Sequence, residues 1–323
     1  MTRRCAFNGC FAPELSCSNG EARIEDCAHW KSGAETVAAG EEPDTTTAVS
    51  SEFRFPWTGN AMGATDLNYL AGASSTRLLA MAGAADAGKT SLLAAFYLLI
   101  ARGIRPDGVA FSGSLTLEGW ENIASNLRWS SRHGPSFPPH TSSGTGRRPG
   151  LLHLSLCMPT KHCELLAADA PGEWFSNWAT NEQDPLSEGA RWLADCSDVF
   201  LVIADSQALT GQHRGQARKG LVDLLRRVGN EARGRPVALV WTKCDIPVPA
   251  DIETTIRDAA NRSLSSYWEF RVSMHPAAEA ENQNRGQGIM ELLQWVLTAP
   301  SKGCAFQQDE APERALLRTF GRF

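Results

Sequence analysis

Short apolar runs and longer amphipathic segments alternate along most of the chain. Residues 78–82, 151–158, 162–168, 199–204, 237–241 and 268–272 are short, apolar or alternating, and typical of strands. Apolar positions three or four residues apart predict helices at residues 92–100, 218–228, 251–264 and 288–297. This alternation predicts an α/β fold: a mostly parallel sheet, helices on both faces, and a ligand at the carboxyl ends of the strands.

One pair of strands departs from this alternation. Residues 151–158 and 162–168 are separated by Pro159, Thr160 and Lys161 alone, so we expect an antiparallel β-hairpin. The segment before the hairpin, residues 129–150, is rich in Ser, Gly, Pro and Arg and is not expected to form regular structure. Long irregular loops inside compact domains usually have a function.

The first strand runs into a loop whose residue types are those of a phosphate-binding site. Its pattern is G-x-x-x-x-G-K-T, followed by a helix, and it comprises Gly83, Ala84, Ala85, Asp86, Ala87, Gly88, Lys89 and Thr90, with Ser91 next. The two glycines allow consecutive backbone N–H groups to turn inward around a phosphate. Lys89 is expected to bridge the β- and γ-phosphates of a nucleoside triphosphate, and the Thr90 hydroxyl to ligate Mg²⁺. The alternative is a glycine-rich turn, but the strand before and the helix after favour nucleotide binding.

A second candidate lies where the hairpin's return strand ends. Asp169 stands at that end, and Gly172 follows in the tetrapeptide D-A-P-G. A carboxylate at this edge of the sheet is suited to hold Mg²⁺ through water, and a glycine lets its N–H approach a γ-phosphate. The pattern D-x-x-G alone is common and usually a turn; its place after an apolar strand gives it weight.

A third candidate follows the strand at residues 237–241 and bears on the choice of base. Thr242, Lys243, Cys244 and Asp245 continue that strand. A carboxylate can accept hydrogen bonds from N1–H and the 2-amino group of guanine, and adenine offers neither donor. We therefore expect Asp245 to select guanine and the Lys243 stem to pack over the purine.

Taken together, these segments resemble the motifs of a known family. Residues 83–90, 169–172 and 242–245, with Ser273 and Met274, resemble in order the motifs of Ras-like GTPases of the translation-factor-related class. Residues 1–30, 56–59 and 114–120 further resemble the double-GTPase type 2 proteins of bacterial conflict systems. The resemblance implies a P-loop NTPase fold of the Ras-like type, GTP or GDP with Mg²⁺ as ligands, and a nucleotide contact for Ser273 and Met274. It also implies a GTP switch acting with partner proteins, including a GAP-like component, in defence.

Three residues depart from the family pattern. Thr242 stands where Asn is more frequent, and we expect it to tether the phosphate loop less firmly. Glu173 stands where Ras-like enzymes carry a water-orienting Gln, so hydrolysis is expected to be slow unless a partner completes the site. Asp86 is a candidate K⁺ ligand, with capping of the following helix as the alternative.

The threonine that completes Mg²⁺ coordination in such enzymes is expected in or before the irregular segment. Thr141 is the first choice, Thr145 the second and Thr116 the third. The same segment carries three arginines that offer an arginine finger, with ordinary solvated charge as the alternative: Arg132, Arg147 and Arg148.

Composition and charge bear on whether the protein binds nucleic acid, is secreted or inserts into a membrane. The 323 residues carry a net charge of −5 with a pI near 5.8, so no overall basic field indicates nucleic acid. No apolar run approaches the ~20 residues that cross a bilayer, and the first residues lack the apolar core of a secretory signal. We expect a cytoplasmic protein that does not insert into a membrane.

The cysteines divide the chain further. Four of the nine cysteines lie in the first 27 residues: Cys5, Cys10, Cys17 and Cys27. They can hold Zn²⁺, and His29 can replace Cys27 as a ligand. The alternative is a disordered head whose cysteines bind no metal. The predicted organisation is a cysteine-rich head at 1–30, an acidic linker at 31–56, a GTPase domain at 57–299 and a tail at 300–323. An ATPase or kinase, and a non-catalytic nucleotide-binding adaptor, are the rival functions.

Overall fold

The computed structural model of the protein describes residues 23–31, 59–63, 66–67, 70, 75–128, 150–274, 286 and 288–300. The chain divides into two units, Met1–Arg54 and Phe55–Phe323. In the first unit, the described residues form a 3₁₀ turn, η1 (Ile24–Asp26), and one short helix, α1 (Ala28–Lys31). All strands below belong to the second unit.

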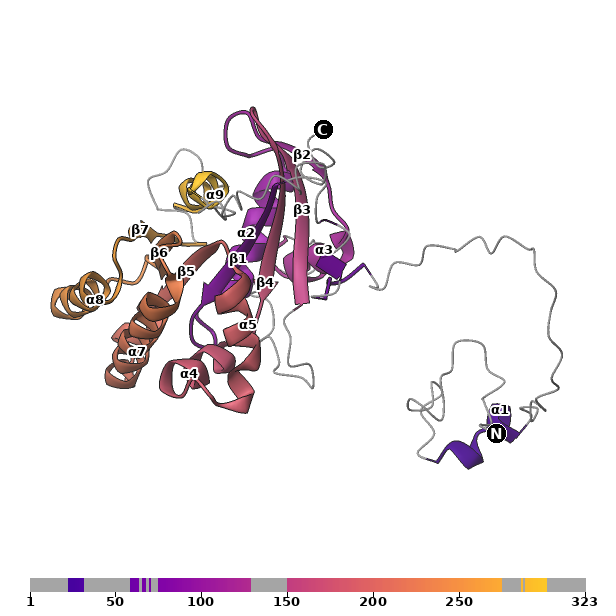
Figure 1. Ribbon diagram of the computed structural model, residues 1–323, viewed down its shortest axis with the longest axis horizontal. Coiled ribbons are helices and arrows are strands. Elements are labelled where there is room, and N and C mark those ends of the chain that lie inside the picture. The colour runs from indigo at the N-terminus through magenta and orange to yellow at the C-terminus, as the bar shows by residue number, and fades with distance from the viewer. Residues whose placement is uncertain are drawn as a thin grey trace, which may run out of the picture. The chain divides into compact units, whose positions relative to one another are not determined.

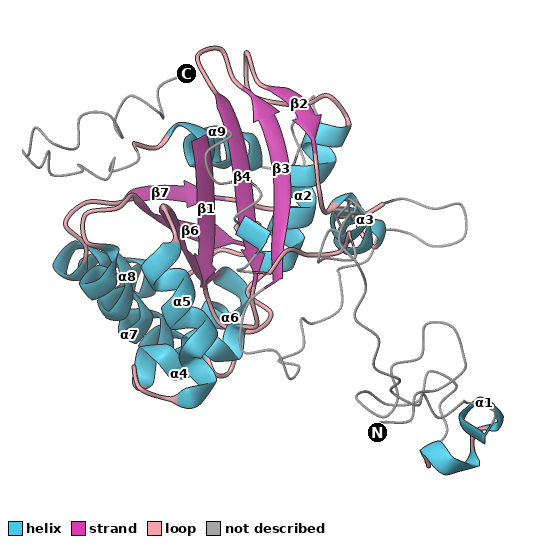
Figure 2. Cartoon of the chain, turned by 45° about the vertical axis from the view of Figure 1, so that its right-hand side comes forward, coloured by secondary structure: helices cyan, strands magenta, loops and turns pink. Residues whose placement is uncertain are grey.

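The second unit is built on one seven-stranded sheet in the order β2-β3-β4-β1-β5-β6-β7 (Figure 2). Its strands are β1 (Ser75–Ala82), β2 (Ala110–Gly113), β3 (Gly150–Cys157), β4 (His162–Asp169), β5 (Val199–Asp205), β6 (Val237–Thr242) and β7 (Trp268–Arg271). The run from β4 through β1, β5 and β6 to β7 is parallel, and β3 pairs antiparallel with both β2 and β4. The predicted parallel sheet and β-hairpin are confirmed, whereas β2 was not predicted.

Helices cover both faces of this sheet (Figure 1). One face packs against α4 (Gly172–Thr180), α5 (Glu188–Cys196), α6 (Ser206–Thr210), α7 (Arg214–Ala232) and α8 (Ala250–Ser263), with a 3₁₀ turn, η3 (Pro185–Ser187), before α5. The other face packs against α2 (Lys89–Ala101), α3 (Leu117–Ser125) and α9 (Ile289–Thr298). Among the described helices, none has the length and apolar character needed to cross a bilayer.

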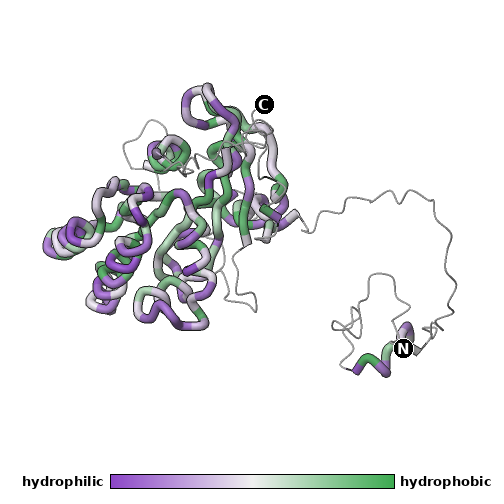
Figure 3. Tube along the Cα trace, viewed as in Figure 1, coloured by the Kyte–Doolittle hydropathy of each residue, from purple (hydrophilic) through white to green (hydrophobic). Residues whose placement is uncertain are grey.

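Alternate residues of each central strand supply the two cores. In β1, Leu78 and Ala80 face the α4–α8 layer, and Leu79 and Met81 face the α2–α9 layer. Burial on both faces explains why the central strands read as continuous apolar runs. Figure 3 shows these strands as predominantly hydrophobic, while α7 and α8 combine hydrophobic and hydrophilic positions.

A buried histidine on β3 fixes α3 against the sheet. The His153 N–H donates to Thr116 Oγ1 at 2.8 Å, and its carbonyl oxygen accepts from Ser114 Oγ at 2.7 Å and Trp120 Nε1 at 2.8 Å. The ring accepts from the Leu115 N–H at Nδ1, 3.0 Å away. Its Nε2 lies 2.7 Å from Glu164 Oε2 and must carry the ring's proton in the neutral state.

Protonation of His153 is expected to destabilise the fold. Burial lowers the pKa of His153, although Glu164 opposes the shift. As the pH falls below the unfolded value of about 6.5, the unfolded chain takes up a proton that the folded ring resists, so the free energy of unfolding decreases. Urea unfolding between about pH 7.5 and pH 5.5 should show this slope, and His153→Gln should flatten it. His162→Gln, at an exposed position on the same hairpin, is the control; equal slopes for both variants and the parent would contradict the assignment.

Candidate functional site

The loop between β1 and α2 adopts the conformation that its glycines allow. Gly88, immediately before α2, has φ +86°, and Asp86 has φ +56°, both in the left-handed region that favours glycine. A Cβ atom added to Gly83 would lie 2.8 Å from Ile203 Cβ, so the loop passes closely over β5. Both glycines are therefore needed, one for its φ and one for space.

Lys89 begins α2 and turns back over this loop. Its Nζ donates to the carbonyl oxygens of Gly83 at 3.1 Å and Ala84 at 2.7 Å, and the residue is 6% exposed. Burial lowers the pKa of Lys89 to about 8, and the nearby carboxylates of Asp169, Glu173 and Asp86 oppose this shift. The ammonium is thus held at the loop by carbonyl oxygens and by three negative charges.

Thr90 and Asp169 lie together beside Lys89. Thr90 Oγ1 donates to Asp169 Oδ1 at 2.8 Å, although the two residues are 79 positions apart. They meet because β1 and β4 are parallel neighbours, so their carboxyl ends share one edge of the sheet. A hydroxyl and a carboxylate oxygen are ligands that Mg²⁺ accepts, with waters and substrate phosphates completing its octahedron. These residues fit Mg²⁺.

Gly172 brings the start of α4 against the phosphate loop. A Cβ atom on Gly172 would lie 2.1 Å from the Ala85 nitrogen and 2.3 Å from the Ala84 carbonyl carbon. Only a glycine allows this backbone-to-backbone approach. Glu173 follows in the first turn of α4, half-buried, and its charge acts on Lys89. The side chain at the expected water-orienting position therefore lies near Lys89, the lysine expected to bind phosphate.

The residues after β6 hold the loop from its other side. Thr242 Oγ1 donates to the Ala87 carbonyl oxygen at 2.9 Å, and Lys243 Nζ donates to that of Asp86 at 2.9 Å. Thr242 was expected to tether the loop less firmly; its hydroxyl nevertheless makes a direct bond of ordinary length. Lys243 Nζ also bonds Asp205 Oδ2 at 2.9 Å and Gln207 Oε1 at 3.0 Å. Sequence reasoning did not assign these last two residues to the site.

Asp245 is oriented by a residue from the end of β7. Ser273 Oγ donates to Asp245 Oδ1 at 2.6 Å, and the Cys244 N–H donates to the Val272 carbonyl oxygen at 3.2 Å. Ser273 is buried, Asp245 is exposed, and Met274 is half-buried against the α2–α9 core. Ser273 was expected to contact a nucleotide, and the structure shows its hydroxyl bonded to the carboxylate of Asp245, the residue expected to select the base.

Other predicted residues lie elsewhere. Thr116 is fully buried and bonded to His153, so its hydroxyl holds α3 rather than facing Lys89 and Thr90. Asp86 does not cap α2, because the capping position is Gly88. The remaining choices for the switch threonine and the arginine finger lie outside the described residues: Thr141, Thr145, Arg132, Arg147 and Arg148.

The cysteine-rich head is described only in part. Cys27 is buried and His29 is exposed, and the other three proposed ligands lie outside the described residues: Cys5, Cys10 and Cys17. Within the described ranges, no three His, Cys, Asp or Glu side chains gather to hold a metal ion. This does not conflict with the Mg²⁺ site above, which offers one carboxylate and one hydroxyl.

Comparisons with known proteins add a family and a solved structure. The sequence profile of the Double-GTPase 2 family matches residues 77–296. Among solved structures, one similar chain is Era in complex with MgGDPNP and nucleotides 1506–1542 of 16S ribosomal RNA, at 15% identity and a TM-score of 0.33. That alignment covers 74% of this chain and 63% of the Era chain, so it spans less than two thirds of Era's length. No curated protein matches the sequence.

Proposed function

The chain belongs to the Double-GTPase 2 family, and on that premise we propose that it is a GTP-binding switch protein that hydrolyses GTP to GDP and phosphate. The observation that carries the proposal is the meeting of Lys89, Thr90 and Asp169 at one edge of the sheet. Asp245, held by Ser273 beyond β6 and β7, supplies a base-selecting carboxylate at the same edge. A glycine-rich turn without function would not require this set of side chains.

The chemistry follows from the positions of these groups. Thr90 and Asp169 would hold Mg²⁺, which supplies charge neutralisation to the phosphates when bound. The Lys89 ammonium donates to two loop carbonyl oxygens and can donate instead to the β- and γ-phosphates when a nucleotide binds. The loop N–H groups and the N-terminus of α2 orient the phosphates. Gly172 places its own N–H close to the loop, where a γ-phosphate is bound.

The presence of Glu173 is a reason to expect slow GTP hydrolysis in the absence of a partner. Its carboxylate acts electrostatically on Lys89, so it stands close to the charge of a γ-phosphate and repels it. A carboxylate also cannot donate a hydrogen bond to orient a water, as a Gln amide does. We therefore propose that a partner protein, such as a GAP-like component, completes the site. The resemblance to the double-GTPase proteins of bacterial conflict systems adds a role in bacterial conflict to this proposal.

Guanine selection by Asp245 tests the proposal. Asp245→Ala is expected to weaken GTP binding by about a hundredfold or more and leave ATP binding unchanged, because two donors of guanine lose their acceptor. Asp245→Asn should favour xanthosine triphosphate, whose C2 oxygen can accept from the new amide. Isothermal titration of the full chain with all three nucleotides measures this, and Asp251→Asn, on the exposed first turn of α8, is the control.

The same titrations separate the rivals. ATP binding as tight as GTP binding, and equally insensitive to Asp245→Ala, identifies an ATPase or kinase and removes the guanine assignment. If GTP binds with Asp245-dependent selectivity but a single-turnover assay releases no γ-phosphate with or without candidate partner proteins, the chain is a nucleotide-binding adaptor.

A further inference from the structure

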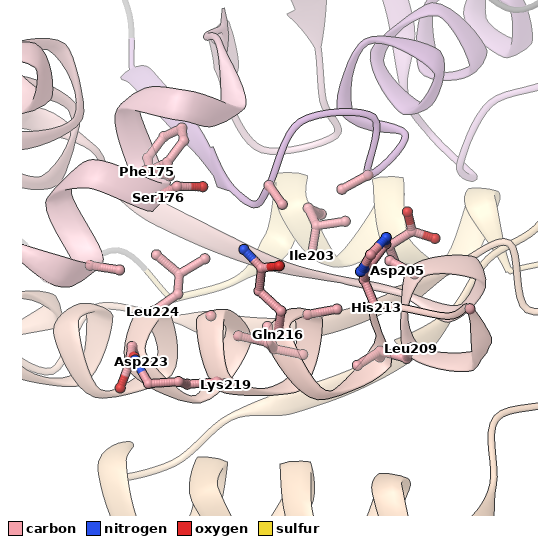
Figure 4. Close-up of a pocket in the computed structure, with 18 of the residues that line it drawn as sticks. Phe175, Ser176, Ile203, Asp205, Leu209, His213, Gln216, Lys219, Asp223 and Leu224 are labelled. Atoms are coloured by element: carbon pink, nitrogen blue, oxygen red, sulfur yellow. The ribbon is translucent and has the colours of Figure 1, made fainter.

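A cavity next to the phosphate loop has no part in the function proposed above. It has a volume of about 590 Å³ and lies between α4 and α7, over the end of β5 (Figure 4). Its apolar walls come from Phe175, Ile203, Leu209 and Leu224. Figure 4 shows Gln216 projecting from α7 into this space. Ligand-binding pockets commonly have this size and this mixture of apolar walls and few polar groups.

The first half of α7, which forms one wall of the cavity, is basic, and Arg214 and Arg218 flank the lining residues His213, Gln216 and Lys219 along this helix. His213, Arg214, Arg218 and Lys219 are exposed in the first half of that helix or just before it, and the first acidic residue of α7 is Asp223. Among the described residues, Arg214 and Arg218 have no ion-pair partner, and Lys219, with 80% of its side chain exposed, pairs only with Asp223 at 3.1 Å. Arg214 lies in the first turn of α7, where a cation opposes the helix dipole, so its charge does not stabilise the helix. In a chain of net charge −5, these cations form a local positive patch.

We propose that this cavity and the basic first half of α7 bind an acidic segment of a partner protein. A leucine or aromatic side chain of that segment inserts into the apolar cavity, and flanking Asp or Glu residues pair with Arg214 and Arg218. Apolar anchors that fill pockets supply most of the affinity of such contacts, while complementary charges set orientation and rate. The apolar walls of the cavity favour a peptide that carries an apolar side chain over nucleic acid.

The position of the cavity places this partner beside the nucleotide-binding residues. Ala84 and Ala87 of the phosphate loop and the carboxylate-bearing Asp205 all border it. Asp205 also holds Lys243, which bonds the loop. The occupant therefore contacts the framework of the nucleotide site without needing GTP hydrolysis, so its binding can be tested independently of turnover.

The test is a selection of random peptides displayed on phage against the purified full-length protein. We expect enriched sequences to combine one leucine or aromatic residue with several flanking carboxylates. An enriched peptide, labelled and titrated by fluorescence anisotropy, should bind about tenfold or more weakly to Gln216→Trp, whose indole narrows the cavity, and to the double variant Arg214→Glu, Arg218→Glu. Both changes are at exposed positions, and the thermal midpoints of the variants verify that they fold.

Arg262→Glu is the matched control, since Arg262 is exposed on α8 and does not border the cavity. It should bind the peptide like the parent. The proposal is overturned if no acidic and apolar sequence is enriched, or if the enriched peptide binds both variants as it binds the parent. It is also overturned in favour of nucleic acid if poly(U) binds and is weakened by the arginine changes but not by Gln216→Trp.

Discussion

Lys89→Met is expected to abolish tight GTP binding while raising the stability of the nucleotide-free protein. The ammonium of Lys89 is the positive charge that the phosphates would meet, and an interaction of this kind with phosphate oxygens is worth several kcal/mol. We expect GTP affinity to fall by about a thousandfold. Met has a similar length without the charge, so it can occupy the same buried space.

The gain in stability follows from the cost of burying that charge. The pKa of Lys89 is lowered to about 8 from an ordinary value of 10.5, mainly by burial, which corresponds to roughly 3 kcal/mol at neutral pH. The sign is that of a lysine with a lowered folded pKa: the cost is fully present below about pH 8 and disappears as the pH rises towards 10.5. The Gly83 and Ala84 carbonyls lose a donor, so we expect a net gain of about 1 kcal/mol.

Two measurements check this prediction. Isothermal titration gives the loss of GTP binding, and thermal unfolding without nucleotide should show a midpoint a few degrees higher, by about 2–4 °C. Lys219→Met is the control, since it removes an exposed lysine whose ion pair is with Asp223 on α7. A Lys89→Met protein that binds GTP within about threefold of the parent would show that the phosphates lie elsewhere.

The same pKa predicts a pH dependence of binding by the parent protein. A bound phosphate stabilises protonated Lys89, so GTP binding above about pH 8 takes up a proton and weakens as the pH rises. Titrations in two buffers of different ionisation enthalpy report this uptake. Lys89→Met should show none.

The arrangement of the candidate site around Lys89 was predictable because its residues follow from local patterns. Gly83, Gly88, Lys89 and Thr90 form a contiguous motif, and the parallel sheet determines that Asp169 meets Thr90. A buried strand followed by a carboxylate can be recognised in the sequence without any knowledge of packing. The fold class followed for the same reason, since two-sided burial leaves continuous apolar runs in the strands.

What could not be predicted depends on contacts between distant residues. The helix α4 contains three large aromatic residues, Trp174, Phe175 and Trp178, and its position is set by packing. A Cβ on Gly189 would lie 2.2 Å from the ring of Trp174. The edge strand β2 is four residues long and largely exposed, so it has no burial pattern to detect. The bond from Lys243 to Asp205 joins positions 38 residues apart that only the sheet brings together.

Gly172→Ala is expected to weaken the binding of GTP much more than the binding of GDP. The added methyl group would collide with the backbone of Ala84 and Ala85 at 2.1–2.5 Å, far inside van der Waals contact, so α4 or the phosphate loop must move. The clash is steric, and it cannot be relieved by a change of rotamer because the atoms that the methyl group meets all belong to the backbone. We expect a loss of about 1–3 kcal/mol in the free energy of unfolding.

The nucleotide dependence of this variant distinguishes a role at the γ-phosphate from a merely structural one. GDP reaches the loop and Lys89 but carries no γ-phosphate near Gly172, so its affinity should change by less than about threefold. Binding of a non-hydrolysable GTP analogue and single-turnover hydrolysis should both fall by about tenfold to a hundredfold, because the Gly172 N–H is displaced from its position. Gly215→Ala is the matched control: a Cβ there meets nothing within 4 Å, and alanine in a helix is expected to stabilise by about 0.5–1 kcal/mol. If Gly172→Ala weakened GDP and the GTP analogue equally, α4 would act on the whole loop, and the assignment of Gly172 to the γ-phosphate would be wrong.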